Sequence, residues 1–191
     1  MSDPVRFVII TALPRPAADV FDQARRAVSR VGRCRAALAY PPHVTLRTGA
    51  LVPHECLDVF LKEIGQTVGA WDAFLIRTGG LLFTTYSEGS ARKQLIGYEI
   101  QKDAPLMELN ARLLRYEKWR ASDRLVFQPH ITLAFDDLTE EGAQSVRVWL
   151  DQDPAALPDS FQWTCDNVGV YRRVGGLWAL HTEWRAGGIN P

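Results

Sequence analysis

The residues best suited to chemistry in this chain lie in a tetrapeptide, His-x-Thr-Leu, that occurs twice. One copy spans His43 to Leu46, the other spans His130 to Leu133, and a proline precedes each histidine. Side chains alternate between the faces of a β-strand, so the histidine and threonine of one copy would share a face. Each copy therefore predicts a strand that packs into the core on one side and presents an imidazole beside a hydroxyl on the other.

Two such pairs predict acid–base chemistry on a phosphoryl group. Imidazole titrates at about pH 6.5, so one histidine can be neutral while the other is protonated, as general base and general acid require. Two threonine hydroxyls can donate hydrogen bonds to phosphoryl oxygens and stabilise developing charge. We expect a phosphodiester to be opened or closed without metal or cofactor. The sequence leaves open which of His43 and His130 is the base.

The duplicated motif, within a repeated strand–helix pattern, resembles the 2H phosphoesterase superfamily, which includes LigT-like 2′-5′ RNA ligases and 2′,3′-cyclic nucleotide phosphodiesterases. The resemblance extends over about residues 5–184. It implies a pseudo-twofold bilobal fold and substrates that are RNA termini or cyclic nucleotides. The usual reaction would be hydrolysis of a 2′,3′-cyclic phosphate to a 2′-phosphate, and some members join RNA ends reversibly. The residues that match the family's catalytic positions are His43, Thr45, His130 and Thr132.

The sequence around the motifs predicts an internal duplication. Residue 43 and residue 130 are 87 positions apart, and the same shift aligns Ile9 with Ile96 and Tyr40 with Phe127. We therefore expect one α+β domain over residues 1–191, with a bilobal, pseudo-twofold duplicated β-sheet and flanking helices. The repeats would span about residues 5–84 and 92–172, followed by a final strand over about 177–184.

Apolar periodicity predicts the individual elements. Strands are expected over 5–11, 43–48, 73–84, 94–101, from 130 onward, 161–172 and 177–184. Helices are expected over 14–31, 53–65, 103–118 and after an N-cap at Thr139. Residues 84–93 and 171–176 are expected to form equivalent loops at the mouth of the site, and Gly175-Gly176 to form the last hairpin turn.

Five further residues are candidates for substrate binding. Arg47 lies four positions after His43, so regular alternation would place it on the same face. Tyr40 and Phe135 flank the motif strands, and Tyr86 and Tyr171 lie in or beside the expected loops. Aromatic side chains can stack on bases for about 1–3 kcal/mol each. The alternatives are core packing for the aromatic residues and a surface position at the strand end for Arg47.

Basic residues gather before each motif and predict either rims that guide RNA or solvated helix faces. They are Arg25, Arg26, Arg30, Arg33 and Arg35 before the first motif, and Arg112, Arg115, Lys118, Arg120 and Arg124 before the second. The chain carries 22 basic and 22 acidic residues, and its formal net charge of zero argues against non-specific binding of long duplex nucleic acid.

The remaining composition predicts a cytoplasmic monomer. The three cysteines are odd in number and scattered, which favours reduced thiols over a disulfide framework or a zinc site. The first residues lack the pattern of a signal peptide, and no apolar stretch is long enough to span a membrane.

Two other functions stay open from the sequence. The same catalytic residues would serve a hydrolase of cyclic oligonucleotide signals, which a substrate panel would separate. The chain could also be a non-catalytic module that binds RNA ends, although all four motif positions are filled. Tight binding without product formation would favour that interpretation.

Overall fold

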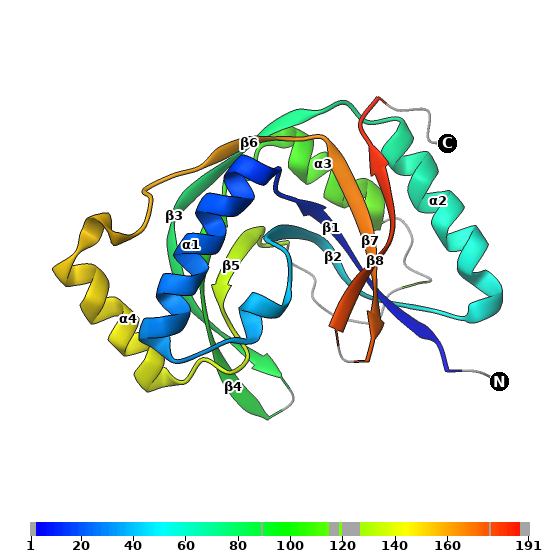
Figure 1. The fold of residues 1–191 in the computed structure, drawn as a ribbon. Helices are drawn as coiled ribbons and strands as arrows, with labels where there is room; N and C mark the ends of the chain where they lie inside the picture. The colour runs from blue at the N-terminus through cyan, green and yellow to red at the C-terminus, as the bar shows by residue number, and fades with distance from the viewer. Residues whose placement is uncertain (1–2, 89, 115–118, 120–126, 176, 188–191) are drawn as a thin grey trace.

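The fold is one eight-stranded sheet with helices packed on it (Figure 1). The computed structural model describes residues 3–88, 90–114, 119, 127–175 and 177–187. The first half contains β1 (Val5–Ala12), α1 (Arg15–Gly32), η1 (Ala36–Ala39), β2 (His43–Val52), η2 (His54–Cys56), α2 (Leu57–Gly69) and β3 (Phe74–Glu88). The second half contains β4 (Ala91–Ile100), α3 (Ala104–Leu114), β5 (His130–Ala134), α4 (Glu140–Gln152), η4 (Pro154–Ala156), β6 (Gln162–Cys165), β7 (Asn167–Val174) and β8 (Leu177–Arg185).

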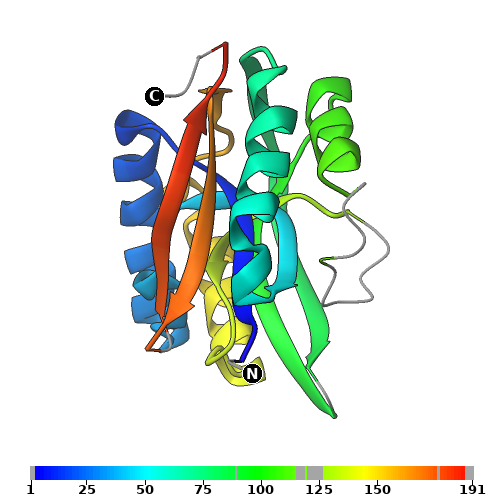
Figure 2. The same cartoon turned by 90° about the vertical axis from the view of Figure 1, so that its right-hand side faces the viewer.

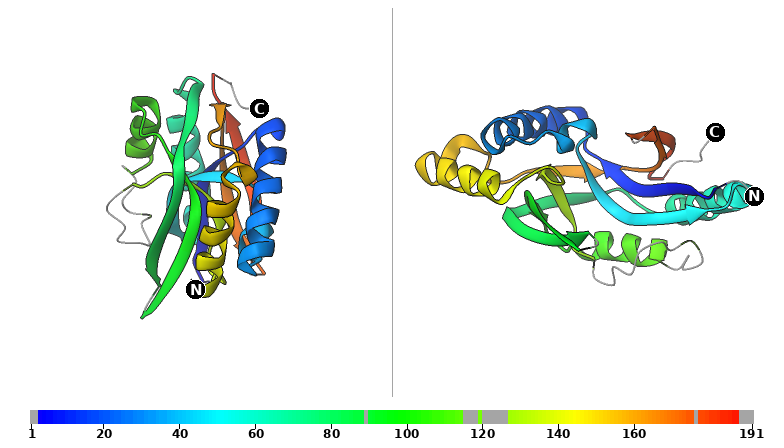
Figure 3. Two further views of the ribbon diagram at one scale, coloured as in Figure 1. Left: turned by 90° about the vertical axis from the view of Figure 1, so that its left-hand side faces the viewer. Right: turned by 90° about the horizontal axis from the view of Figure 1, so that it is seen from below.

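The sheet consists of two lobes that meet at the motif strands. Its order is β6-β3-β4-β5-β2-β1-β7-β8, and all the recorded strand pairs are antiparallel. The strands β5 and β2 therefore lie at the centre, with three strands on either side. Seen from below, α1 and α4 lie toward one end of the molecule and α2 toward the other (Figure 3).

The duplication is visible in the register of individual residue pairs. Ile9 pairs with Arg47 on one side of the centre, and Ile96 pairs with Ala134 on the other. Each residue of the second pair lies 87 positions after its counterpart in the first. The adjacent pairs, Ile10–Thr45 and Gly97–Thr132, obey the same shift. The expected α+β fold with a duplicated pseudo-twofold sheet is thus confirmed.

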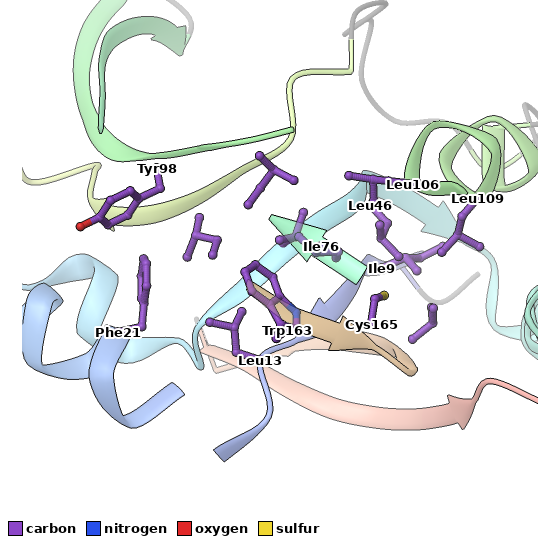
Figure 4. Packing of buried hydrophobic residues seen from close by; sticks show 14 of the residues in the cluster. Ile9, Leu13, Phe21, Leu46, Ile76, Tyr98, Leu106, Leu109, Trp163 and Cys165 are labelled. Atoms are coloured by element: carbon purple, nitrogen blue, oxygen red, sulfur yellow. The ribbon is translucent and has the colours of Figure 1, made fainter. Parts of the chain in front are cut away.

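The first helix of each half packs on strands of the other half. The ring of Phe21 in α1 lies 5.8 Å from that of Tyr98 in β4, and both are fully buried. Conversely, the Asn110 side-chain amide of α3 donates a hydrogen bond to the Leu46 carbonyl of β2 at 2.6 Å. Figure 4 shows Phe21 facing Tyr98, and Leu46 grouped with side chains of α3. This exchange joins the two lobes through one continuous core.

The other two helices cover the outer parts of the lobes. In α2, Phe60 packs against Phe7 of β1, with ring centroids 5.3 Å apart. Figure 2 shows α2 beside β7 and β8. In α4, the guanidinium of Arg147 lies 4.1 Å from the ring centre of Phe83 in β3. The predicted N-cap of α4 is confirmed, because the Thr139 hydroxyl accepts a 3.0 Å hydrogen bond from the backbone of Gly142.

Three sequence expectations about the elements are wrong. The segment 161–172 is not one strand, because β6 pairs with β3 in one lobe and β7 pairs with β1 in the other. The segments 84–93 and 171–176 are not mouth loops, since Tyr86 pairs with Lys93 in the β3–β4 hairpin and Tyr171 pairs with Leu180 in the β7–β8 hairpin. Residues 115–118 of the expected third helix, and Gly176 of the expected turn, lie outside the described residues.

Candidate active site

The two motifs lie side by side because β2 and β5 are neighbours in the sheet. Their recorded antiparallel pair is Val44 with Ile131. This register brings Thr132 opposite His43 and His130 opposite Thr45, and residues opposite each other have Cβ atoms about 4.5–5.5 Å apart. All four motif side chains are half-buried, whereas Val44 and Ile131 are fully buried. We call the face of the sheet with the four motif side chains the histidine face, and the opposite one the core face.

Both imidazoles are held by the same backbone contact. The Nδ1 atom of His43 lies 2.7 Å from the carbonyl oxygen of Pro41, and that of His130 lies 2.8 Å from the carbonyl oxygen of Gln128. A carbonyl only accepts hydrogen bonds, so Nδ1 must carry a proton in each ring. In the neutral form of either ring, Nε2 is then the unprotonated nitrogen. Each histidine can therefore take up or release a proton at Nε2 without losing the bond that orients it.

The prolines before the histidines tie the start of each motif strand to the strand beside it. The Pro42 carbonyl accepts a hydrogen bond from the Leu13 amide at 3.2 Å, and the Pro129 carbonyl accepts one from the Ile100 amide at 3.0 Å. Proline has no amide hydrogen to donate, but its carbonyl can still join the sheet. Both motif strands therefore begin in the same way.

Arg47 does not share the histidine face, and the expectation that it would is wrong. The register of β2 with β1 shifts between Thr45, which pairs with Ile10, and Arg47, which pairs with Ile9. This β-bulge at Leu46 breaks the alternation, so Arg47 follows Leu46 to the core face. Its guanidinium is buried, with 6% of the residue exposed, and donates a hydrogen bond to the Leu113 carbonyl at the end of α3. The equivalent bulge at Leu133 puts Ala134 on the core face.

The contacts recorded for the described parts of the α-helices lie on the core face of the sheet. Along β1, β4 and β3, the strand residues that contact these helices alternate with the residues of the histidine face. Arg47 of β2 contacts α3 because the bulge at Leu46 places Arg47 on the core face. Within the described part of the chain, no contact of an α-helix with the histidine face is recorded. The half-burial of the motif side chains is consistent with a surface that can receive a substrate.

The electrostatic surroundings of the two histidines differ. Burial lowers the pKa of His43 below its ordinary value, and the positive charges of Arg25 and His130 lower it further, against the opposing effect of the Pro41 carbonyl. Arg25 is itself buried, pairs with Asp22, and donates hydrogen bonds to the carbonyls of Ala37 and Tyr40. It therefore fixes the segment before β2 and places a positive charge near His43.

Glu99 is a candidate site residue that the sequence reasoning missed. It pairs with His130 across β4 and β5, whereas the equivalent neighbour of His43 is Ala12. Glu99 is exposed, and its register places it on the histidine face. Ala12 and Glu99 occupy equivalent positions in the two halves, because they are 87 residues apart. The sequence could show this equivalence, but only the order of strands in the sheet shows that each residue lies beside a motif histidine.

The four aromatic candidates fall in different places. Tyr40 and Phe135 are half-buried and lie together, with ring centroids 5.8 Å apart, beyond the His43 end of the motif strands. Tyr86 lies near the end of the β3–β4 hairpin, opposite Lys93. Tyr171 is 9% exposed, and a Cβ added at Gly169 would come within 2.8 Å of its ring. The structure thus brings Tyr40 and Phe135 together and keeps Tyr86 and Tyr171 on separate lobes.

Other polar groups near the motifs have structural contacts. Asp137 accepts hydrogen bonds from the backbone amides of Arg35 and Ala36, and Asp136 forms an ion pair with Lys93. Arg112 pairs with Glu108, while Arg115, Lys118, Arg120 and Arg124 lie outside the described residues. Over the ranges that the structure describes, no three histidine, cysteine or acidic side chains are arranged to hold a metal ion. In the same ranges, no helix has the length and apolar character to cross a membrane.

Comparisons with known proteins identify the family. A model of the 2′-5′ RNA ligase superfamily matches residues 13–177. The chain belongs to this superfamily. The expected resemblance to 2H phosphoesterases is therefore confirmed, and membership supports 2H phosphoesterase chemistry in general terms. A search of curated proteins finds no match.

Several solved structures share the fold. E. coli LigT, in a crystal structure with 3′-AMP, is 18% identical with a TM-score of 0.63, and the match covers 97% of this chain and 100% of LigT. TT0787 of Thermus thermophilus is 17% identical with a TM-score of 0.63, with coverage of 97% and 100%. Usb1 of Kluyveromyces marxianus is 15% identical with a TM-score of 0.52, with coverage of 93% and 97%. At these identities the likeness concerns the fold.

Proposed function

We propose that this 2H family member opens 2′,3′-cyclic phosphates of RNA ends or nucleotides to 2′-phosphates. The observation that carries the proposal is the cross-strand arrangement of two His-Thr pairs, in which both Nδ1 atoms are held by backbone carbonyls. LigT of E. coli has been crystallised with 3′-AMP, NADP+, ATP and phosphate, which supports nucleotides as ligands of this fold.

In the proposed step, one histidine takes a proton from water as the water oxygen attacks phosphorus. The bond between phosphorus and the ribose 3′ oxygen breaks, and the second histidine protonates that oxygen as it leaves. Thr45 and Thr132 donate hydrogen bonds to the non-bridging oxygens, where negative charge grows. If a ribose 5′-hydroxyl takes the place of water, the same step forms a 2′-5′ linkage, which accounts for reversible RNA ligation.

The surroundings favour His43 as the base and His130 as the acid in hydrolysis. The lowered pKa of His43 keeps its Nε2 free of a proton and ready to accept one near neutral pH. Glu99 lies opposite His130 in the sheet, whereas the equivalent neighbour of His43 is Ala12. We therefore assign the role of base to His43 and the role of acid to His130, since directional acid–base catalysis requires two different roles.

The test is incubation with the four nucleoside 2′,3′-cyclic phosphates and with a short RNA that ends in one, with and without EDTA. Phosphorus NMR identifies the monoester. We expect EDTA-resistant formation of a 2′-phosphate, and a loss of turnover of about 10²–10⁴-fold in His130→Ala. His54→Ala is the matched control, because His54 is exposed and lies outside the motifs.

Near-wild-type turnover by His130→Ala would overturn the proposed mechanism. A 3′-phosphate product would reverse the assignment of the leaving oxygen. Absence of product from every substrate would reject 2′,3′-cyclic phosphate hydrolysis. Cyclic oligonucleotides and non-catalytic binding of RNA ends would then be tested with the same variants.

A further inference from the structure

A pair of arginines on the lobe formed by β2, β1, β7 and β8 has no assigned role. We propose that Arg6 and Arg173 form a second phosphate site, which holds an internal phosphate of a single-stranded RNA whose 3′ end occupies the motif residues. The inference rests on the proposed function and deepens it, because it makes an RNA terminus, rather than a free cyclic nucleotide, the preferred substrate.

Strand register places both arginines on the histidine face. Along β1, residues 6, 8, 10 and 12 alternate with the core residues Phe7 and Ile9, and Ile10 pairs with Thr45 of the motif. Phe7 pairs with Arg172 of β7, so the next residues outward, Arg6 and Arg173, come level with each other. Arg6 and Arg173 therefore lie on the same side of the sheet as Thr45.

The two arginines stand beside a hollow without a counter-charge. After Phe7 and Arg172 no further β1–β7 pair is recorded, and a cavity of about 460 Å³ lies between the strand ends. Its lining includes Arg6, Arg172 and Arg173, and all three are exposed. In the described structure, none of these three side chains has a hydrogen-bond or ion-pair partner. Like charges opposite each other destabilise a sheet, so a bound anion would relieve the repulsion between Arg6 and Arg173.

Apolar and aromatic side chains flank the arginine pair on neighbouring strands. Arg6 pairs with Leu51 of β2, and Arg173 pairs with Trp178 of β8. Tyr171 and Leu180 form the next pair toward the motif. A positive track interleaved with aromatic residues is the arrangement that binds single-stranded nucleic acid, because bases of any sequence can stack on the rings.

The equivalent position in the other lobe is neutralised. The shift of 87 positions equates Arg6 with Lys93 and Arg173 with Tyr86, and these two residues also pair with each other. Lys93 forms an ion pair with Asp136, so its charge is already compensated. The difference between the lobes predicts that the RNA strand runs over β1 and β7 and not over β3 and β4.

The distance along β1 sets the length of RNA required. Arg6 lies four residues from Ile10, which corresponds to about 13 Å at about 3.3 Å per residue. A stacked strand rises about 3.4 Å per nucleotide, so about four stacked nucleotides, or fewer extended ones, cover that distance. A mononucleotide held by the motif residues would not contact Arg6.

The experiment compares wild type with Arg6→Gln/Arg173→Gln and with the control Arg15→Gln/Lys62→Gln. The control removes the same charge from two exposed positions on α1 and α2, outside the basic clusters that precede the motifs. Fluorescence anisotropy with a single-stranded RNA hexamer gives affinity as a function of salt, and turnover is measured on a mononucleotide and a hexamer that end in a cyclic phosphate. We expect the test variant to lose about tenfold in affinity and its salt slope to fall by about 0.7, as the loss of one neutralised phosphate predicts. Its kcat/KM should fall for the hexamer only.

Three outcomes would overturn the inference. The test variant could lose kcat/KM equally for mononucleotide and hexamer, the control variant could lose as much hexamer affinity as the test variant, or the test variant could lose no hexamer affinity. Failure of the proposed function is distinguishable, because the wild type would then turn over neither substrate. Anisotropy would still decide the arginine site in that case, since binding of the hexamer does not depend on hydrolysis. A wild type that binds no hexamer would also reject the site.

Discussion

His43 and Thr132 face each other across the central antiparallel pair of strands, although they belong to different copies of the motif. The same register brings Thr45 level with His130. Each histidine thus lies between the threonine of its own strand and that of the neighbouring one. The proposed site therefore takes one histidine and one threonine from each half of the chain.

The threonines are expected to act on the rate rather than on the fold. Thr45→Val or Thr132→Val removes one hydroxyl and keeps a β-branched side chain on the strand. We expect kcat on a 2′,3′-cyclic phosphate to fall by up to about 10²–10³-fold. Thr48→Val, at an exposed position on β2, is the control and should leave kcat unchanged. If both motif variants kept full activity, the threonine hydrogen bonds to the phosphoryl oxygens would not be part of the mechanism.

The lowered pKa of His43 has consequences for catalysis and for stability. The acid limb of kcat/KM against pH, which reports the free enzyme, should lie below the ordinary histidine value of about 6.5. A neutral His43 in the folded state means that the unfolded chain binds more protons below that pH, so the free energy of unfolding should decrease as pH falls from about 6.5 toward the lowered pKa. His43→Gln should lack this component. NMR titration of the His43 ring checks both points, and a value above 6.5 would contradict them.

Glu99 is expected to tune His130 rather than to contact the phosphate. Glu99→Gln keeps the size of the side chain and removes the negative charge opposite His130. We expect kcat on a 2′,3′-cyclic phosphate to fall with little change in KM, because Glu99 lies beside the histidine and not beside the phosphate. Glu183→Gln, on the distant strand β8, serves as the control. A loss of stability with unchanged kcat would indicate a structural role only.

Arg47 is expected to contribute to stability and not to RNA binding. Replacement by Met removes the buried hydrogen bond to the Leu113 carbonyl and leaves that acceptor without its partner. We expect a loss of about 1–3 kcal/mol in the free energy of unfolding, measured by denaturant titration. The kcat of the folded fraction should match the wild type. A selective rise in KM for RNA would instead assign Arg47 to substrate binding.

The sequence predicts the central features of the fold because they depend on local alternation and on a repeated motif. The spacing of His43 and Thr45 already implies a shared face, and the shift of 87 positions implies equivalent strands. Both predictions depend on the residue types along the individual strands and do not require knowledge of which strands pair.

The errors arise where pairing between strands decides the outcome. Alternation alone would put Arg47 beside His43, but the bulge at Leu46 depends on how β1 and β2 pair. Tyr86 and Tyr171 precede polar and glycine-containing residues that look like loops, yet both tyrosines lie in hairpin strands. Glu99 becomes a candidate only when β4 is known to lie next to β5. The monomeric state and the cytoplasmic location stay predictions from composition.

Because α1 and α3 each pack on the opposite lobe, two chains of half this length could assemble into the same fold. Two identical half-chains related by the same twofold axis would pair their motif strands, trade their first helices, and form an isologous homodimer with two equal His-Thr pairs. In such a dimer, base and acid would be chemically indistinguishable. In a single polypeptide the equivalent positions can differ, as Ala12 differs from Glu99 and Arg6 from Lys93. Covalent continuity between the halves is thus what permits a symmetric scaffold to favour one direction of the proposed reaction.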